Sequence, residues 1–217
     1  AAPDGYTLLL ASTPSNAIAP SLDKNLTYDP IKDLQPVARV VSYPYVLAVS
    51  TTLPVRSVKE LIDYAKARPG ALNYGSTGEG TGVQLAGALF NNKAGLSITH
   101  IPYNSMGQMS ADLSSGSVHL VFYPYQGVLP LIQAGKVRVL ASTGAKRSPS
   151  LQDIPTMIEQ GVADYDIVAW MALNVPGDTP PDRVQTLYEA VRKTVQDPKV
   201  VERLRDAFAR APDLESR

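Results

Sequence analysis

Apolar and polar positions along the chain change period several times, and each change predicts a new element. Between residues 72 and 142, short apolar runs typical of buried strands alternate with segments whose apolar residues recur at helical spacing. The predicted order is strand, helix, strand, helix, strand, helix, strand. Because strands that alternate with helices favour a parallel sheet with both faces covered, this region predicts an α/β unit with a parallel sheet.

The flanking segments predict further elements. Apolar runs predict strands over residues 6–11, 36–41, 45–50 and 166–174. A capping box begins at Ser57. Thr179 is expected to cap a helix with Pro180 in its first position, and a last helix is predicted to run through Ala209.

The segment LNYGSTGEGTGVQLAGALF, residues 72–90, combines a strand, a glycine-rich loop and the start of a helix. Glycines allow positive φ and leave the backbone amides uncovered, while the first turn of a helix has unpaired N–H groups and a partial positive charge. These features favour anion binding. The hydroxyls of Ser76, Thr77 and Thr81 add neutral donors, and the loop has no Lys or Arg. The expected ligand is therefore a small anion such as a carboxylate.

Spacing argues against two nucleotide-binding motifs in this loop. A P-loop requires Lys after its second glycine, but Thr81 and Val83 follow Gly80 and Gly82. A dinucleotide-binding loop requires Gly-x-Gly-x-x-Gly and an acidic residue after the next strand, and residues 98–103 provide none. A tight turn without a ligand remains the alternative for this loop considered alone.

The carboxyl ends of the predicted strands carry further polar and aromatic residues. Ligands of open α/β sheets bind beyond these ends, where the strand order reverses. The residues predicted to lie there are Gly75–Thr77, Tyr103–Ser105 and Tyr123–Tyr125. Their tyrosines are candidates for the wall of a cleft, and a half-buried structural role is the alternative for each.

Composition narrows the function. The chain of 217 residues has 20 basic and 20 acidic side chains, so its formal net charge is zero and no nucleic-acid partner is expected. It has no Cys, which excludes disulfides and thiolate metal sites. No apolar run reaches the roughly 18 residues of a membrane span, so direct membrane insertion is not expected.

Signatures of catalysis are missing as well. The two histidines, His100 and His119, fall on predicted strands without a second ligand at metal-binding spacing, so structural or solvent-facing roles are expected. No motif pairs a nucleophile with a base. We therefore predict no catalytic residue, no metal, no cofactor and no enzymatic activity.

Six sequence motifs occur in one order over nearly the whole chain, up to about Leu204. They are APDGYTLLLAS (residues 2–12), YDPIKD (28–33), LNYGSTGEGTG (72–82), HIPY (100–103), AKRSPSLQDIPTMIEQG (145–161) and AWMALNVPGDTP (169–180). With these motifs the chain resembles the extracytoplasmic solute receptors of tripartite tricarboxylate transporters, also called Bug receptors.

The resemblance implies an α/β periplasmic-binding-protein fold of type II topology, with two lobes that close like a Venus flytrap on a small carboxylate. Lobe one would comprise residues 1–48 and 167–217, and lobe two residues 49–166. Receptors of this family hold the carboxylate mainly with main-chain amides and small hydroxyls. The corresponding ligand-binding residues of this sequence would be, in lobe two, Ser76, Thr77, Gly78, Thr81, Tyr103, Asn104 and Tyr123 and, in lobe one, Ser12, Thr13 and Trp170.

Three departures from the family pattern change the expectation. Family members have a signal peptide, a strand and a glycine-rich loop ahead of APDGYTLL, so lobe one is expected to be incomplete at its N-terminus. Asn104 and Ser105 replace the usual Lys-Gly after HIPY, which removes a cation. Tyr123 replaces a usually acidic residue, which favours a less polar or aromatic carboxylate and argues against an ammonium group on the ligand.

The function implied by the resemblance is capture of a small organic acid in the periplasm. The receptor would act as a monomer and deliver the acid to the membrane subunits of a tripartite tricarboxylate-type transporter. Four alternatives stay open: a ligand-sensing receptor for a signalling partner, a truncated paralogue that does not bind, an enzyme on the same fold, and the effector domain of a transcription regulator.

Overall fold

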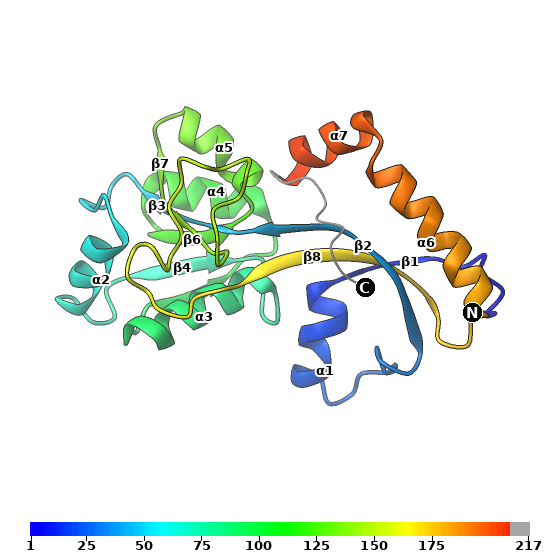
Figure 1. The fold of residues 1–217 in the computed structure, drawn as a ribbon. Helices are drawn as coiled ribbons and strands as arrows, with labels where there is room; N and C mark the ends of the chain where they lie inside the picture. Colours follow the sequence, from blue (N-terminus) through cyan, green and yellow to red (C-terminus); the bar gives the residue numbers. More distant parts are fainter. Residues whose placement is uncertain (209–217) are drawn as a thin grey trace. The chain divides into compact units, whose positions relative to one another are not determined.

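The computed structural model describes residues 1–208 and divides into two compact units (Figure 1). Unit 1 is formed by Ala1–Ser42 and the chain from Ala169 onward, and unit 2 by Tyr43–Val168. The lobe boundaries expected from the sequence, 48/49 and 166/167, differ from these. The first boundary differs because the whole of strand β3 (Val46–Ser50) pairs within the sheet of unit 2.

Unit 1 contains a three-stranded sheet in the order β1-β8-β2, with β1 at Leu9–Ser12, β8 at Val168–Pro176 and β2 at Leu34–Pro44. Strand β1 runs antiparallel to β8, with Ala11 opposite Ala172. The helical elements are η1 (Pro14–Ile18), α1 (Ala19–Leu22), α6 (Pro181–Val195) and α7 (Pro198–Phe208). Strands β2 and β8 both cross the unit boundary, so the chain passes between the units on two strands.

Two sequence predictions in unit 1 are wrong in detail. The first strand begins at Leu9, because residues 6–8 lie outside the pairing with β8. Thr179 does not cap α6: its hydroxyl donates to the Pro176 carbonyl at 2.7 Å, and Pro180 takes the N-cap position without a side-chain hydrogen bond. The predicted end of the last helix at Ala209 lies outside the described residues.

Unit 2 is built on a five-stranded sheet in the order β5-β4-β6-β3-β7. Besides β3, its elements are α2 (Val58–Lys66), β4 (Asn73–Ser76), α3 (Gly82–Ala94), β5 (Thr99–Pro102), α4 (Met106–Ser115), β6 (Leu120–Tyr123), α5 (Tyr125–Gln133) and β7 (Val137–Ser142). The alternation predicted between residues 72 and 142 is therefore confirmed.

The strands predicted between residues 72 and 142 all run in one direction, and one antiparallel strand from outside that region, β3, lies between β6 and β7. Strand β4 pairs parallel with β5 and β6, but β3 runs antiparallel between β6 and β7. Strand β3 enters the sheet directly from β2 through Tyr45, without a crossover helix. The rule that makes strand-helix-strand units parallel therefore does not apply to it.

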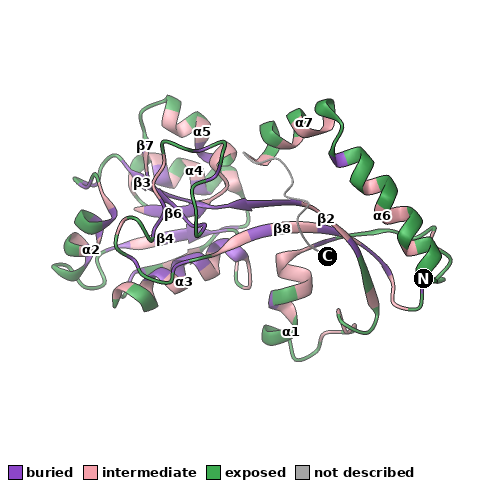
Figure 2. Cartoon of the chain, in the orientation of Figure 1, coloured by how far each residue is buried: buried purple, intermediate pink, exposed green. Residues whose placement is uncertain are grey.

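The core of unit 2 lies on both faces of this sheet, whose strands are largely buried (Figure 2). Helix α3 covers one face, and α4 and α5 cover the other (Figure 1). Under α3, Phe90 packs on Phe122 of β6 with ring centroids 5.9 Å apart, and Tyr165 stacks on Phe122 at 6.2 Å. The Tyr165 hydroxyl donates to the Ala86 carbonyl at 2.7 Å, so this buried phenol has the partner that its burial requires.

Helix α2 begins as the sequence predicts. The Ser57 Oγ accepts a hydrogen bond from the Glu60 amide at 3.1 Å, and Glu60 Oε2 accepts one from the Arg56 amide at 2.7 Å. The capping box is thus confirmed, with its return bond made to the residue before the cap.

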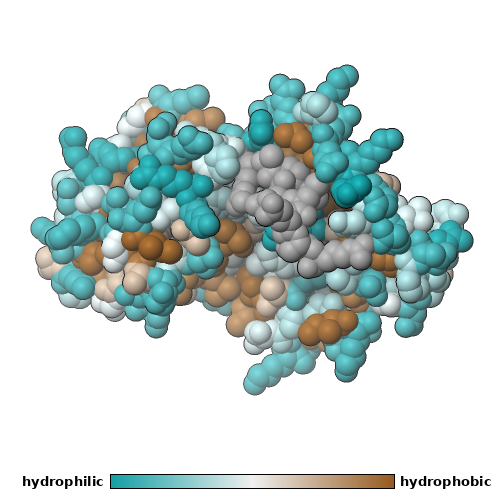
Figure 3. Space-filling view, viewed as in Figure 1, coloured by the Kyte–Doolittle hydropathy of each residue, from teal (hydrophilic) through white to brown (hydrophobic). Residues whose placement is uncertain are grey.

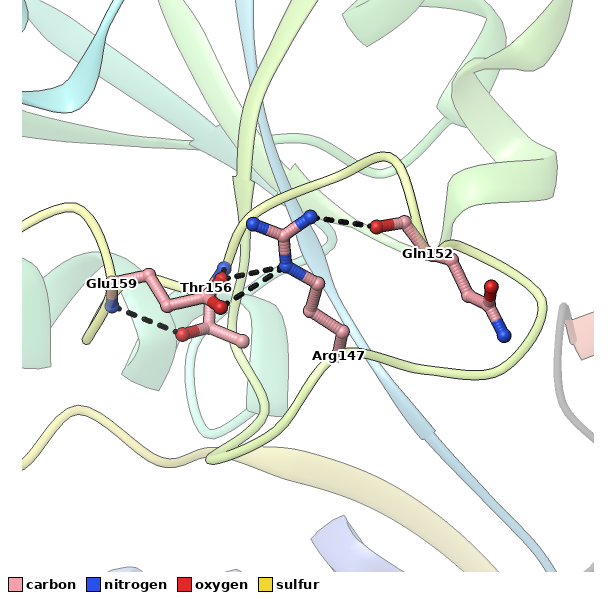
Figure 4. Close-up of polar contacts among 4 residues, drawn as sticks. All are labelled: Arg147, Gln152, Thr156 and Glu159. Carbon is pink, nitrogen blue, oxygen red and sulfur yellow. Dashed lines mark hydrogen bonds and ion pairs between the residues drawn. The ribbon is translucent and has the colours of Figure 1, made fainter.

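Residues 143–167 connect β7 to β8. Hydrogen bonds among four residues of this segment, Arg147, Gln152, Thr156 and Glu159, hold part of it in shape (Figure 4). Arg147 Nε donates to both carboxylate oxygens of Glu159, at 3.1 and 2.9 Å, and Arg147 Nη1 donates to the Gln152 carbonyl at 2.8 Å. The Thr156 amide donates to Glu159 Oε2 at 2.7 Å, and the Glu159 amide returns a bond to Thr156 Oγ1 at 3.1 Å. The amide of Thr156, followed by the Arg147 guanidinium, lowers the pKa of the Glu159 carboxyl.

Large apolar side chains at the surface lie mostly in unit 1. Those exposed are Tyr6, Leu8, Leu9, Leu10, Leu22 and Ile31, with Ile158 in unit 2. Hydrophilic side chains are interspersed with apolar ones on the face drawn in Figure 3. Within residues 1–208, no helix has the length and apolar character needed to cross a membrane.

Candidate functional site

The carboxyl ends of three parallel strands meet at one edge of the sheet in unit 2, called here the carboxyl edge. Strands β4, β5 and β6 end at Ser76, Pro102 and Tyr123 and lead to α3, α4 and α5. Antiparallel β3 begins at the same edge, where Val46 lies opposite both Tyr123 and Ser142, the last residue of β7. The predicted convergence of these strand ends is confirmed.

The strand order reverses at β4. The chain moves from β4 to β5 on one side and then crosses to β6 on the other, which places α3 and α4 on opposite faces. Ligands of open α/β sheets bind beyond the strand ends at such a reversal. Here that position falls between the β4–α3 loop and the β6–α5 connection. Three helices begin along this edge, and each N-terminus carries a partial positive charge.

The β4–α3 loop is held by the hydroxyls at its two ends. Ser76 is fully buried, and its Oγ accepts a hydrogen bond from the Gly78 amide at 3.1 Å and lies 2.6 Å from His100 Nε2. Thr81 caps α3: its Oγ1 accepts from the Gln84 amide at 3.3 Å and donates to the Gly78 carbonyl at 2.8 Å. Both hydroxyls therefore already have partners inside the loop, and the ligand contact predicted for them stays a prediction.

Two glycines are required by the geometry of this loop. Gly78 has a φ of 116°, a conformation that residues with a Cβ rarely adopt. Gly82, the first residue of α3, lies so close to the Tyr45 hydroxyl that an added Cβ would collide with it. Sequence reasoning assigned the first glycine to a ligand site, and the structure shows that its conformation also shapes the loop.

Two kinds of hydrogen-bond donor near this loop have no partner within residues 1–208. They are the Thr77 side chain and the first amides of α3. The Thr77 side chain is exposed and has no hydrogen-bond partner within the described chain. The amides of Gly82 and Val83 have no acceptor within the helix, because a helical amide donates to the carbonyl four residues earlier and those carbonyls precede α3. No hydrogen bond between residues 1–208 uses these two amides. A small anion would find at least three neutral donors here.

Tyr103 is buried and its hydroxyl points to α4. The hydroxyl donates to Asp112 Oδ2 at 2.7 Å, and the Tyr103 amide donates to the Ser76 carbonyl at 2.8 Å. Burial, together with that hydrogen bond and the Asp112 charge, raises the pKa of Tyr103 to about 12. Tyr103 thus ties the end of β5 to β4 and α4. Asn104 beside it is exposed, and its side chain has no partner among the residues described.

Three tyrosines gather at the carboxyl edge: Tyr43, Tyr45 and Tyr123. The rings of Tyr43 and Tyr45 meet edge to face with centroids 6.1 Å apart. Burial, and then the neighbouring phenols, raise the pKa of Tyr43 and Tyr45, and burial raises the pKa of Tyr123. All three phenols therefore stay protonated at neutral pH. Sequence reasoning found only Tyr123, although the repeated Tyr-Pro-Tyr of residues 43–45 and 123–125 was a signal for the other two.

Of the three predicted residues of unit 1, Ser12 ends β1, Thr13 is the N-cap of η1, and Trp170 lies beside Thr13 on β8. The Thr13 Oγ1 accepts a hydrogen bond from the Trp170 amide at 2.9 Å and lies 3.4 Å from the Trp170 carbonyl. The Ser12 amide donates to Ser15 Oγ at 3.0 Å. The hydroxyl of Thr13 is thus used to join the η1 start to β8.

The two histidines have structural partners, as the sequence predicts. His100 lies against Ser76, and His119 lies at the opposite edge of the sheet with Nδ1 2.9 Å from Asn73 Oδ1. Burial lowers the pKa of both imidazoles. Across residues 1–208, no group of three or more His, Cys, Asp or Glu side chains is placed to hold a metal ion.

Comparisons with known proteins give one consistent family. The model of the tripartite tricarboxylate transporter family receptor matches residues 1–211. BugT of Bordetella pertussis is 34% identical over 202 residues, which are 93% of this chain and 62% of BugT. The chain spans about three fifths of the length of the curated relatives it matches.

Solved structures of similar sequence share the fold. A protein of R. palustris determined with adipate has a TM-score of 0.84 at 35% identity, covering 96% of this chain and 70% of its own. MatC from Rhodopseudomonas palustris with bound malate has a TM-score of 0.82 at 29% identity, with coverage of 99% and 73%. The periplasmic binding protein BugD has a TM-score of 0.80 at 31% identity, with coverage of 95% and 69%. The predicted α/β periplasmic-binding-protein fold is therefore confirmed.

Proposed function

Because the chain belongs to the tripartite tricarboxylate transporter receptor family, a family of solute-binding receptors, we propose that it is a periplasmic receptor for a small organic carboxylate. The observation that carries the proposal is the carboxyl edge of unit 2. Three helices begin along this edge, and the glycine loop that leads into α3 has free amides and a free hydroxyl but no cationic side chain. The proposal includes that the protein binds the carboxylate and catalyses no reaction on it.

The physical basis is a set of neutral donors that have no partner in the described chain and lie in one short segment, residues 77–83. A carboxylate has two oxygens and accepts several hydrogen bonds, and bonds to a charged acceptor are about twice as strong as neutral ones. The amides of Gly82 and Val83 and the Thr77 hydroxyl supply such donors. Since the backbone fixes the amides, they need little reorganisation when the anion arrives. The helix N-termini add a field that favours an anion.

The tyrosines at the carboxyl edge bear on the part of the ligand that lies beyond its carboxylate group. The Tyr45 and Tyr123 phenols stay neutral, so neither supplies an anion to pair with a ligand ammonium. These two side chains favour an aliphatic or aromatic carboxylate without an amino group, and the exposed Glu79 is the one acidic side chain of the loop. Adipate and malate, named with two of the solved relatives, are the natural first compounds to test.

The proposal also includes three properties that membership of the family implies. These are closure of the two lobes on the ligand, delivery to the membrane subunits of a tripartite transporter, and action in the periplasm. Co-purification of the ligand-loaded receptor with those membrane subunits, compared with the ligand-free receptor, would test delivery separately from binding.

Thermal unfolding with a panel of acids tests the binding proposal. The panel is succinate, malate, adipate, citrate and benzoate, with glutamate as the amino-acid control. A ligand that binds only the folded state at a hundredfold excess over its Kd stabilises that state by about 2.7 kcal/mol, so a saturable rise in Tm is expected for at least one acid. A cooperative transition that none of the acids shifts would contradict the proposal, and a rise with glutamate alone would contradict the ligand class.

A further inference from the structure

The His100 imidazole contacts the glycine loop from strand β5. Its Nε2 lies 2.6 Å from Ser76 Oγ, and its ring lies on that of Tyr74 with centroids 5.0 Å apart and planes at 33°. Strand β5 is at the edge of the sheet and the His100 side chain is partly exposed. Solvent therefore has access to an ionisable group that touches the proposed binding loop.

The Ser76 hydroxyl is shared among more partners than its single proton can serve. Its Oγ accepts from the Gly78 amide at 3.1 Å, and its proton has two possible acceptors: the Gly78 carbonyl at 3.1 Å and His100 Nε2 at 2.6 Å. When Nε2 is unprotonated, it competes for this proton. When Nε2 carries a proton, it donates to Ser76, whose own proton then goes to the Gly78 carbonyl.

We propose that His100 is a positioning residue of the carboxylate-binding loop and acts through Ser76 on the Gly78 peptide. This inference rests on the proposed function, because it assigns a role within the same site. The Gly78 carbonyl also accepts from Thr81, the N-cap of α3, so the bond from Ser76 and the helix cap share one acceptor. The orientation of the Ser76 hydroxyl is therefore linked to the start of α3, where the free amides lie.

The doubly protonated imidazole favours anion binding in two ways. It always carries a proton on Nε2, which the neutral ring does in only one of its two tautomers, so it secures the chain of hydrogen bonds from His100 through Ser76 to the Gly78 carbonyl. It also adds a positive charge beside a loop that has no cation of its own. Carboxylate affinity should therefore rise as the pH falls through the pKa of His100. By linkage, a bound carboxylate should raise that pKa.

The groups around His100 set the pH at which its imidazole gains the second proton. Glu79 in the loop is the carboxylate whose field acts on His100, and Tyr74 is the titratable ring against it. Charged groups of the covering helices have partners of their own: Lys93 with Asp164, and Asp112 with Tyr103. Burial lowers the pKa of His100 and Glu79 opposes this, so the transition is expected below the ordinary histidine value of about 6.5.

Nuclear magnetic resonance tests the inference on the chain without any ligand. As the pH is lowered, the Gly78 amide resonance should shift with the same midpoint as the His100 ring nitrogens. Ser76→Ala should abolish the shift of Gly78 and leave the titration of His100 in place. A Gly78 amide that does not respond to the His100 titration in the unmodified chain would overturn the inference, whatever the variants do.

Calorimetric titration with adipate, malate and benzoate adds the binding readout. As the pH is lowered from about 8, the affinity should rise by roughly fivefold, with the midpoint at which the His100 ring titrates in the resonance experiment. His100→Gln keeps a donor for Ser76 and should bind without this pH dependence, while His100→Phe should bind about fivefold more weakly.

The control is His119→Gln, which removes the other histidine at the opposite edge and should leave the pH dependence unchanged. A His100→Gln variant that keeps the dependence would overturn the inference. If the unmodified chain binds none of the three acids, the proposed function fails instead, and the response of the Gly78 amide still decides the role of His100.

Discussion

Ser76 and Thr81 carry the hydroxyls that the sequence marks as ligand donors, yet each is already hydrogen-bonded to the Gly78 peptide. Thr77 between them is exposed and has no partner in the part of the chain described. At the scale of single residues, the loop therefore has two kinds of polar group. Some form hydrogen bonds that hold the loop in shape, and others are available to donate hydrogen bonds to a ligand. Substitutions at the two kinds of position should give different results.

Gly78→Ala tests whether loop shape controls binding. Gly78 and Gly95, at φ 116° and 63°, both have positive φ, and a Cβ at either would meet no atom within 4 Å. Alanine in a left-handed conformation costs about 1–2 kcal/mol, so both variants should have a lower Tm. Carboxylate affinity, measured by calorimetry, should fall by about tenfold in Gly78→Ala and stay unchanged in Gly95→Ala. Equal affinities in the two variants would contradict a role of the loop in binding.

At the scale of elements, the start of α3 carries both a helix cap and the donors of the proposed carboxylate site. Thr81 caps this helix in the same manner as Ser57 caps α2, through a bond to the amide three residues on. The two caps differ in their surroundings, because only the Thr81 hydroxyl also donates to the Gly78 carbonyl. Helix α2 therefore provides a matched control for α3.

Thr81→Ala and Ser57→Ala should each lower the free energy of unfolding by about 1 kcal/mol, because each leaves a helix amide without its cap. Denaturant titration measures this cost. Thr81→Ala should also weaken carboxylate binding, and Ser57→Ala should not. Loss of binding in both variants would show that general destabilisation, and not the loop, is responsible.

The segment between β7 and β8 depends on a carboxylate, and its stability should depend on pH. Bonds from the Thr156 amide and then from Arg147 depress the pKa of Glu159 below its ordinary 4.5. A depressed pKa stabilises the folded state above the ordinary value, and this stabilisation is lost as the pH falls through the lower, folded value.

Glu159→Gln should therefore have a lower Tm than the unmodified chain at neutral pH, and the difference should shrink as the pH falls below 4.5. Thermal scans over a pH series check this. Glu189→Gln removes an exposed ion pair to Arg192 on α6 and should change Tm little. A constant difference between Glu159→Gln and the unmodified chain at all pH values would contradict the role of the charge.

At the scale of the whole molecule, sequence patterns predicted most elements and the edge where they meet. Alternating strands and helices between residues 72 and 142 were readable because each apolar run is bounded by glycine, proline or a capping residue. Strand β3 was predicted, but its antiparallel place in the sheet was not, since pairing partners depend on contacts far apart in sequence. Its partners lie in β6 and β7, more than 70 residues further along.

The position of the candidate loop at the carboxyl edge was predictable, but its hydrogen bonds were not. The glycine loop and its helix indicated an anion site from local sequence alone. That His100 would reach Ser76, and that Tyr45 would lie against Gly82, depends on which strands are neighbours. A spacing rule cannot supply this, because both contacts join residues more than 20 positions apart.

The most direct measurement is an amide-resolved titration of the chain with succinate, malate, adipate and benzoate by nuclear magnetic resonance. Binding at the carboxyl edge predicts saturable shifts of the Thr77, Gly82 and Val83 amides with at least one acid, with Gly95 at the far end of α3 unaffected. Saturable binding that leaves these three amides unmoved, or no saturable shift with any of the four acids, would contradict the proposed carboxylate site.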